Sequence, residues 1–321
     1  MKSILKLGFI LITAMLLVSS AGVKKADAAS SSLQFAVPVE TARYKWSLAL
    51  VRADNTMQLV PIQGELKTAA VNSGGTKVAY VIRTTDKLKV YTCDSQGKNS
   101  KMIVEYRSDK RNMQDFIDLL FTNNSNTLLM AKYIKNEISF LEYDFKKGQP
   151  RFLNKTEWKG MPFIVHSLDP GSGGQLVFKL DSHEGGGTAQ QIWTMSAHSP
   201  GTSLFLELES PPTIINMVPD LSNKRVIASC SNTRNVAVRD QMKSMMIIDS
   251  AVKEPKSIIQ DLVFENMTKS GNGNAVIWRC SKVGAEVKFK KYDLKTGKIS
   301  DIPAAESAEK DAQNPVAVPG K

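Results

Sequence analysis

The stretch 70–103, AVNSGGTKVAYVIRTTDKLKVYTCDSQGKNSKMI, decides the fold that we predict for this chain. Its first reversal is NSGG at 72–75, where glycine supplies the positive φ that a tight turn needs. Apolar segments at 78–82 and 88–91 follow as strands, and the second ends in a polar turn at 94–97. With one more strand after that turn, the stretch predicts four short antiparallel strands in ~40 residues, the pattern of one propeller blade.

The same unit recurs along the chain. When the copies are aligned on the apolar residue that opens the second strand, their separations are 50, 48, 50 and 50 residues. A Gly-, Asn- and Ser-rich turn precedes each copy. The third strand runs into Asp in most copies, but into Ser196 in the copy aligned on Leu176. A fixed period of four strands is typical of a propeller. The aligned residues are Val78, Leu128, Leu176, Val226 and Val276.

The sequence therefore predicts an all-β fold, a six-bladed β-propeller of four-stranded antiparallel blades. Five repeats are complete. The first blade, at 33–66, is imperfect and one strand short, because only a half-unit around Leu48 to Asp54 precedes the first full copy. The segment Pro315 to Pro319 (PVAVP) is a candidate for the missing strand, since propellers commonly close by pairing the two chain ends. The alternative is that it belongs to a disordered C-terminal tail at 304–321.

The first 28 residues read as a secretory signal peptide. Lys2 and Lys6 precede a short apolar run at 8–18, and a small-x-small site predicts cleavage between Ala28 and Ala29. An uncleaved anchor is the alternative. No later run approaches the roughly 20 apolar residues of a membrane helix. We therefore expect a secreted or periplasmic monomer, with the propeller at 29–303 and no transmembrane segment after signal removal.

Charge favours anionic partners. Removing the signal peptide lowers the formal net charge from +11 to +8, which favours wall polymers, acidic glycans, lipid head groups or acidic proteins in general. A merely solvated basic face is the alternative. The chain contains no helix-turn-helix, zinc-finger or RNA-recognition motif, so no nucleic acid partner is expected.

The three cysteines are predicted to form no disulfide. Cys230 and Cys280 lie one period apart on equivalent second strands. Equivalent side chains in neighbouring blades point the same way around the ring, and packed sheets lie about 10 Å apart. That separation exceeds what a disulfide tolerates. We expect both to be buried, unpaired residues, and Cys93 has no evident partner.

The sequence contains no catalytic motif and no cofactor or metal motif. HExxH, GxSxG and P-loop spacings are absent. Of the three histidines, His166 sits in an alternating strand and His198 in a turn. His183, beside Glu184 in a Gly-rich loop with Asp181, makes at most a weak cation site. We predict no catalytic residue, metal ligand or cofactor.

The predicted topology places a basic surface on one face. Loops between second and third strands share a face with the connections between blades, and the two longest, at 181–190 and 231–242, belong to adjacent blades. Loops on a rigid scaffold commonly carry binding residues. We therefore predict that this basic face is the binding platform for an anionic partner. With His183, the side chains expected on it are Arg107, Lys110, Arg111, Lys155, Lys159, Arg234 and Arg239.

The repeats resemble those of TolB-like propellers, a WD40-like class, over roughly 67–303. In that family a Ser-Pro-Asp-Gly turn leads into an apolar strand, and a second strand ends in Asp and a Gly-containing turn; the stretches 74–80 and 91–97 match best. No copy has the intact Ser-Pro-Asp-Gly, and the N-terminal α/β domain of TolB has no counterpart here. The resemblance implies a fold and a typical role, binding other proteins in the cell envelope. It does not support a Tol-system assignment and transfers no functional residue.

Our interpretation is a non-catalytic binding scaffold of the cell envelope, with an envelope protein or an anionic wall polymer as partner. The alternative is a hydrolase-like envelope enzyme with its site at the propeller mouth. A carboxylate or His cluster at the central channel would favour it. A third possibility is a sensor domain whose partner is encoded elsewhere.

Overall fold

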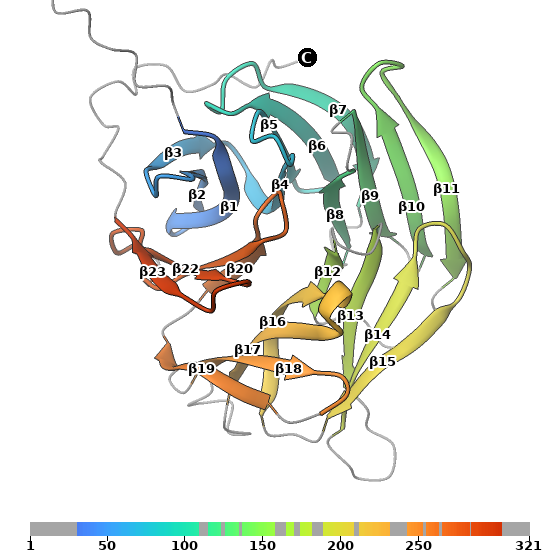
Figure 1. Cartoon of the computed structure of the whole chain (residues 1–321). Coiled ribbons are helices and arrows are strands. Elements are labelled where there is room, and N and C mark those ends of the chain that lie inside the picture. The colour runs from blue at the N-terminus through green and yellow to red at the C-terminus, as the bar shows by residue number, and fades with distance from the viewer. Residues whose placement is uncertain are drawn as a thin grey trace, which may run out of the picture. The chain divides into compact units, whose positions relative to one another are not determined.

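Six antiparallel sheets, each a meander of consecutive strands, surround a central axis (Figure 1). The computed structural model describes residues 31–108, 115–122, 126–134, 137–157, 165–169, 174–181, 189–208, 212–231, 243–252, 255–262, 265–282 and 284–303. Within them, regular structure is almost entirely β-strand, with one turn of 3₁₀ helix at Leu221–Asn223. The predicted all-β, six-bladed propeller is confirmed.

The sheets follow the chain in order and are called blades one to six. Blade one holds β1 (Leu33–Ala42), β2 (Lys45–Arg52) and β3 (Met57–Ile62). Blade two holds β4 (Glu65–Val71), β5 (Lys77–Arg83), β6 (Lys87–Asp94) and β7 (Lys101–Arg107). Blade three holds β8 (Phe116–Phe121), β9 (Thr127–Ile134), β10 (Glu137–Asp144) and β11 (Gln149–Glu157).

The remaining three blades are also four-stranded. Blade four holds β12 (Val165–Asp169), β13 (Gln175–Asp181), β14 (Gln190–Ser196) and β15 (Thr202–Leu208). Blade five holds β16 (Thr213–Asp220), β17 (Arg225–Ser231), β18 (Lys243–Asp249) and β19 (Pro255–Leu262). Blade six holds β20 (Glu265–Lys269), β21 (Ala275–Arg279), β22 (Phe289–Asp293) and β23 (Ile299–Ile302). Five blades are complete and the first has three strands among the described residues, as predicted.

The hydrophobic core is divided into six clusters, each between two neighbouring blades. One cluster joins blades one and two, the next blades two and three, and so on until the last joins blades six and one. Each sheet is therefore covered on both faces. This explains why second strands such as β5 and β17 are buried at nearly every position instead of alternating between buried and exposed residues.

A polar side chain closes the turn after the third strand in blades two to six, and the turn after β2 in blade one. Asp94 Oδ1 accepts hydrogen bonds from the backbone N–H groups of Gln96 and Lys98, and Asp144 Oδ1 accepts one from Lys146. In blade four, where Ser replaces Asp, Ser196 Oγ accepts the N–H of His198. The recurring Asp is therefore structural, because it replaces backbone partners that the turn leaves unsatisfied. The equivalent residues in the other blades are Asp54, Asp249 and Asp293.

The ring closes through the first strands. β4, β8, β12, β16 and β20 contact one another in sequence, and β1 contacts both β20 and β4. We call the face with the turns between first and second strands the mouth face, and the opposite one the far face. Connections between blades and loops between second and third strands lie on the far face.

β1 runs in the opposite direction to the other five first strands. At its start, the carbonyl of Gln34 accepts a hydrogen bond from Gly271, in the β20–β21 turn on the mouth face. At its end, the carbonyl of Thr41 accepts one from Gly284, between β21 and β22 on the far face. β2 then runs into the Asp54 turn, as third strands do in other blades. Blade one thus corresponds to the second, third and fourth strands of a full blade, and its innermost strand is the one that is missing.

The inner ends of blades two and six meet in front of the start of β1. A Cβ on Gly271 would lie 2.7 Å from the carbonyl oxygens of Val71 and Asn72, at the end of β4. Only glycine allows this approach. Because blades two and six already touch at the mouth face, the ring is closed there without a further inner strand. The candidate closing segment at 315–319 lies outside the described residues.

Buried cations reinforce three seams on the far face. Arg279 is fully buried and donates from Nη1 to the carbonyl of Glu40 at 2.8 Å, linking blade six to blade one. Arg83 donates to Ser108 Oγ in the connection towards blade three. Lys179 donates to Gln190 Oε1, which also accepts the N–H of Ile214 in blade five. Each cation sits at or near the end of a second strand and ties its blade to the next one.

Candidate functional site

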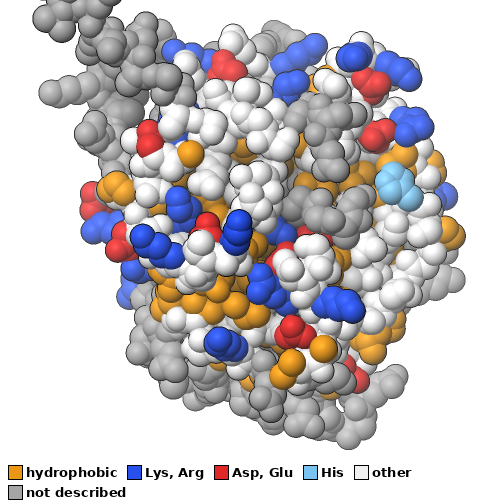
Figure 2. Space-filling view, viewed as in Figure 1, with side chains coloured by type: hydrophobic (Ala, Val, Ile, Leu, Met, Phe, Trp, Pro, Cys, Tyr) orange, Lys and Arg blue, Asp and Glu red, His pale blue; other side chains and the backbone are white. Residues whose placement is uncertain are grey.

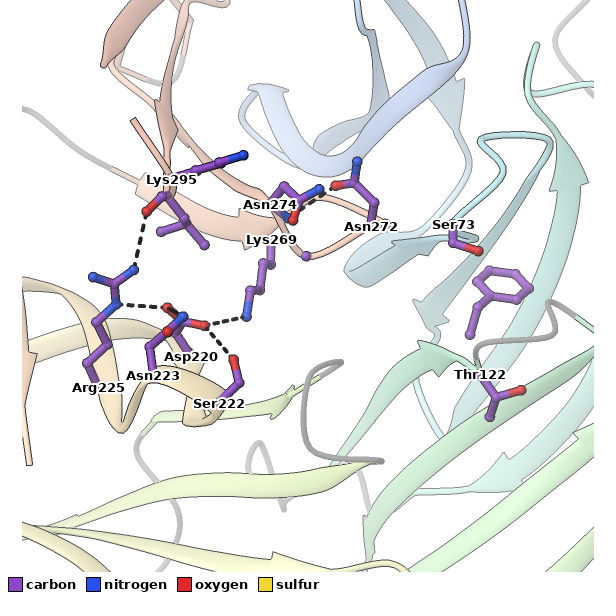
Figure 3. Close-up of a pocket in the computed structure, with 14 residues that line it drawn as sticks. Ser73, Thr122, Asp220, Ser222, Asn223, Arg225, Lys269, Asn272, Asn274 and Lys295 are labelled. Atoms are coloured by element: carbon purple, nitrogen blue, oxygen red, sulfur yellow. Dashed lines mark hydrogen bonds and ion pairs between the residues drawn. The ribbon is translucent and has the colours of Figure 1, made fainter. Parts of the chain in front are cut away.

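A cavity of about 800 Å³ opens on the mouth face (Figure 3). Its lining comes from the turns that follow the first strands of blades two, three, five and six, together with the β22–β23 turn. These turns are short and polar because each reverses the chain beside the axis. The lining residues are Ser73, Phe121, Thr122, Asp220, Ser222, Asn223, Arg225, Lys269, Gly271, Asn272, Gly273, Asn274, Leu294 and Lys295.

Lys269 joins three blades at the floor of this cavity. It is the last residue of β20, and its side chain, which is 8% exposed, extends towards Asp220 of blade five (Figure 3). Its Nζ lies 3.4 Å from Asp220 Oδ1, 3.3 Å from Asp169 Oδ1 in blade four and 3.0 Å from the carbonyl of Pro219. One ammonium therefore neutralises carboxylates from two other blades.

Asp169 is the most deeply placed member of this network. Its side chain is fully buried, and Oδ2 has no hydrogen-bond partner among the described residues. A buried carboxylate depends strongly on a nearby cation, because burial alone disfavours its charged form. Lys269 is the cation that the described part of the chain places beside it.

Asp220 is saturated with donors. Its Oδ2 accepts from Arg225 Nε at 2.8 Å and from Asn223 Nδ2 at 3.0 Å. Its Oδ1 accepts from Ser222 Oγ as well as from Lys269. Burial by itself raises the pKa of this carboxyl. The hydrogen bonds from Arg225 and Asn223 and the nearby positive charges outweigh burial and lower the pKa of Asp220 below its ordinary value.

The central channel is narrow where the first strands approach each other. A space of about 70 Å³ lies between β4, β8, β12 and β20. One of the residues beside it is Asp118, whose Oδ2 lies 2.7 Å from His166 Nδ1 in the neighbouring blade. The imidazole also stacks on Phe116, with ring centroids 3.5 Å apart. This pair is a carboxylate–histidine contact at the channel, but the space beside it holds little more than water.

The predicted basic face lies on the side opposite the cavity. Arg107 ends β7 and is exposed there. Lys155 is also exposed, and its Nζ lies 3.3 Å from Glu137 Oε2. Two of the predicted basic residues are thus placed, and the structure does not bring them to the mouth. The others, Lys110, Arg111, Lys159, Arg234 and Arg239, lie outside the described residues, as does His183.

Sequence reasoning missed the mouth residues. A polar residue at the end of each first strand recurs in blades two to six with separations of 50, 47, 51 and 50 residues, a period that could have marked them. The residue type varies, however, which hid the pattern. The residues are Asn72, Thr122, Asp169, Asp220 and Ser270.

The cysteines are free thiols. Cys93 and Cys230 are buried, and burial raises the pKa of each thiol to about 12. Cys280 is only half-buried, so the expectation that it is buried like Cys230 is wrong. It lies just beyond the last residue of β21, whereas Cys230 lies within β17. Burial also raises the pKa of Cys280, so all three are protonated at neutral pH.

Metal-binding clusters and membrane-spanning helices were considered for the described part of the chain. There, no three His, Cys, Asp or Glu side chains gather closely enough to hold a metal ion. The same residues include no helix with the length and apolar character needed to cross a membrane. Residues 182–184, which with Asp181 were considered above as at most a weak cation site, fall outside that part.

Comparisons with known proteins concern the fold. No family model matches the sequence, and no curated protein matches it either. Among solved structures, TolB from Acinetobacter baumannii superposes with a TM-score of 0.58 at 13% identity, covering 85% of this chain and 64% of that one. The described strands therefore have a close geometric counterpart. The chain has the fold of a TolB-like β-propeller.

Two other structures share the arrangement of this TolB-like propeller. A putative TolB from Agrobacterium tumefaciens has a TM-score of 0.51 at 9% identity, covering 85% of this chain and 90% of that one. A chain from a nidogen/laminin complex has a TM-score of 0.52 at 13% identity, covering 85% and 92%. At such identities the likeness shows the fold alone. This chain spans less than two thirds of the Acinetobacter TolB, so functions of that whole protein do not carry over.

Proposed function

We propose that this TolB-like propeller is an exported, non-catalytic binding scaffold of the cell envelope, with an anionic polymer or an envelope protein as its partner. The observation that carries the proposal is the donor-rich cavity at the mouth of a closed ring. Its walls come from four blades, so the polar groups are held by six packed clusters and need little reordering on binding.

Charge supports an anionic partner. Three cations line the cavity, Arg225, Lys269 and Lys295, against the lining carboxylate of Asp220 and the buried carboxylate of Asp169 beneath it. This leaves an excess of one positive charge. Figure 2, drawn from the same side as Figure 1, shows Lys and Arg side chains around the centre of the ring with fewer Asp and Glu. A positive cleft raises the local concentration of anions and speeds their association. Export rests on the sequence, on the signal peptide at 1–28 with cleavage between Ala28 and Ala29.

Affinity capture tests the proposal. The purified mature protein, residues 29–321, is immobilised and exposed to envelope extract from its own host at low and at moderate salt. We expect one specific polymer or protein to be retained at low salt and released as salt rises, because salt screens exposed charges. An empty column at both salt concentrations would contradict the scaffold function.

The same column decides between the two faces. A Lys295→Glu variant changes the mouth. An Arg234→Glu/Arg239→Glu variant changes the basic face predicted from sequence. The other residues predicted on that face, Arg107, Lys110, Arg111 and His183, stay unchanged in this variant. We expect the mouth variant to lose the partner and the basic-face variant to retain it. The reverse result would move the binding site to the basic face.

An enzyme is the second candidate, and the contact between Asp118 and His166 favours it. A histidine oriented by a carboxylate is a common general base. The small space beside the pair and the stacking of Phe116 on the imidazole argue against access by a substrate. A screen of hydrolase substrates with the wild type and with His166→Ala tests this alternative. Turnover that His166→Ala abolishes would establish an enzyme.

A further inference from the structure

We infer that the mouth cavity binds a hydroxyl-rich anion, a sugar that carries a carboxylate or a phosphate. This inference rests on the proposed binding function and specifies the ligand for the same site. It follows from which hydrogen-bonding groups of the lining are already used and which are left.

The acceptor capacity of the lining carboxylate is used internally. Both oxygens of Asp220 accept two donors each, from Arg225, Asn223, Ser222 and Lys269. A ligand donor would therefore have to displace an internal bond. The cavity is correspondingly unsuited to a cation or a ligand made mainly of donors.

Among the described lining residues, three side chains keep donors that are not used internally. Asn272 Oδ1 accepts the hydroxyl of Ser270 and the N–H of Asn274, which orients the amide and leaves its Nδ2 for a ligand. Arg225 uses Nε for Asp220 and Nη2 for the carbonyl of Leu294, so its Nη1 remains. The ammonium of Lys295 is paired with no carboxylate among the described residues.

These donors line one cavity and come from different elements. Asn272 lies in the β20–β21 turn, Arg225 begins β17, and Lys295 lies in the β22–β23 turn (Figure 3). Such a group of two cations and an amide suits the oxygens of a carboxylate or phosphate, because hydrogen bonds to charged oxygens are the stronger ones.

The volume of the cavity indicates a ligand larger than an inorganic anion. The cavity of about 800 Å³ lies within the roughly 300–1,000 Å³ of sites for small organic ligands, so a single inorganic ion would occupy a small part of it. Phe121 and Leu294 add apolar surface to an otherwise polar lining. A pyranose ring matches this lining, because its hydroxyls can bond the lining amides and its C–H faces can pack on these two side chains. The polar lining provides no apolar pocket for the side chains of a peptide.

Matched sugars test the ligand class. We would titrate the mature protein, residues 29–321, with glucose, glucuronic acid and glucose 6-phosphate by isothermal calorimetry at low salt. We expect one or both anionic sugars to bind at least about tenfold more tightly than glucose. Comparing glucuronic acid with glucose 6-phosphate shows whether the site prefers a carboxylate or a phosphate. Equal binding of all three sugars, or of none, would overturn the inference.

A matched pair of lysine variants locates the site. Lys295→Glu reverses a lining charge, whereas Lys298→Glu makes the same change three residues away, at an exposed position of the same blade that is not part of the lining. We expect Lys295→Glu to weaken the anionic sugar by about tenfold or more and Lys298→Glu to change it by less than about twofold. Equal losses in both variants would place binding outside the cavity. Both residues are exposed, and thermal unfolding verifies that both variants fold.

Other outcomes separate this inference from the proposed function. Binding of an N-acetylated diglutamate peptide but of neither anionic sugar would overturn the sugar class. Capture of an envelope partner equally by wild type and Lys295→Glu, without sugar binding, would overturn the inference and leave the scaffold function standing. Sugar binding followed by turnover would support the ligand class and contradict a non-catalytic role.

Discussion

At the scale of single residues, the mouth depends on an ammonium that compensates two carboxylates. Lys269 approaches Asp169 and Asp220, and all three side chains are largely buried. Removing one partner of a buried ion pair lowers the free energy of unfolding by more than the complete pair contributes to it. The reason is that the remaining charge stays buried and unpaired. This network is therefore sensitive at Lys269 in particular.

Lys269→Met tests that dependence. We expect the free energy of unfolding to fall by about 3 kcal/mol or more, as for other broken buried ion pairs. Urea denaturation measures it. Asp220 keeps its ion pair with Arg225, so Asp169 is the carboxylate that loses its cation. The double variant with Asp169→Asn removes that charge and should recover part of the loss. If the double variant were no more stable than Lys269→Met, unpaired charge would not be the cause.

The lowered pKa of Asp220 predicts that the free energy of unfolding decreases at acid pH. Because its pKa is lowered in the folded protein, the unfolded chain binds the proton more readily. The stability that this carboxylate contributes is present above its unfolded pKa of about 3.9 and is lost as pH falls through the lower folded value. Urea midpoints at pH values below about 4 should decline less steeply in Asp220→Asn than in wild type. Parallel declines would show that other carboxyls dominate.

At the scale of elements, the turn after the third strand is closed by a polar side chain in each repeat, whereas the direction of the first strand differs in blade one. The Asp that ends the third strand makes its hydrogen bonds within the next few residues, so the turn was predictable from sequence. The position of β1 is different. Its direction depends on Gly271 and Gly284, which lie more than two hundred residues further along the chain and bond its two ends. A one-strand deficit was predictable, and which strand was missing was not.

Gly271→Ala tests the closing contact between blades two and six. A Cβ there would lie 2.7 Å from two backbone oxygens, which cannot move without shifting β4. We expect a loss of about 1–3 kcal/mol, in the range of overpacked positions. Gly74→Ala is the matched control, because its Cβ would meet nothing closer than 3.9 Å and its φ is not positive. Equal thermal stability of the two variants would contradict a tight contact at Gly271.

At the scale of the whole molecule, the ring is held by six equivalent interfaces, and one of them joins the ends of the chain. Blades one and six share a core cluster, and buried Arg279 donates across this interface to Glu40, a partner 239 residues away in sequence. Every other interface connects blades that are consecutive in the chain. The interface between blades six and one therefore has the largest loop-closure cost and depends most on its contacts.

Arg279→Met tests that dependence. The side chain also donates to the carbonyl of Lys282 and to Ser281 Oγ, so its loss leaves buried acceptors without a donor. We expect a loss of about 3 kcal/mol or more, with hydrogen exchange increasing first in β1 and β21. A similar increase in all blades would contradict a weakened seam and indicate global destabilisation.

The sequence by itself determined the repeat, the six blades and the incomplete first blade. Turn chemistry and strand periodicity act over a few neighbouring residues, so they can be read in order along the chain. Only the tertiary structure decided the direction of β1, the closure of the ring and the cavity at its mouth. These depend on pairs such as Lys269 and Asp169, 100 residues apart, whose meeting follows from how whole blades pack around the axis. The basic face was predicted from topology, whereas the donor-rich mouth required the tertiary structure, because its side chains come from five separate turns in four blades.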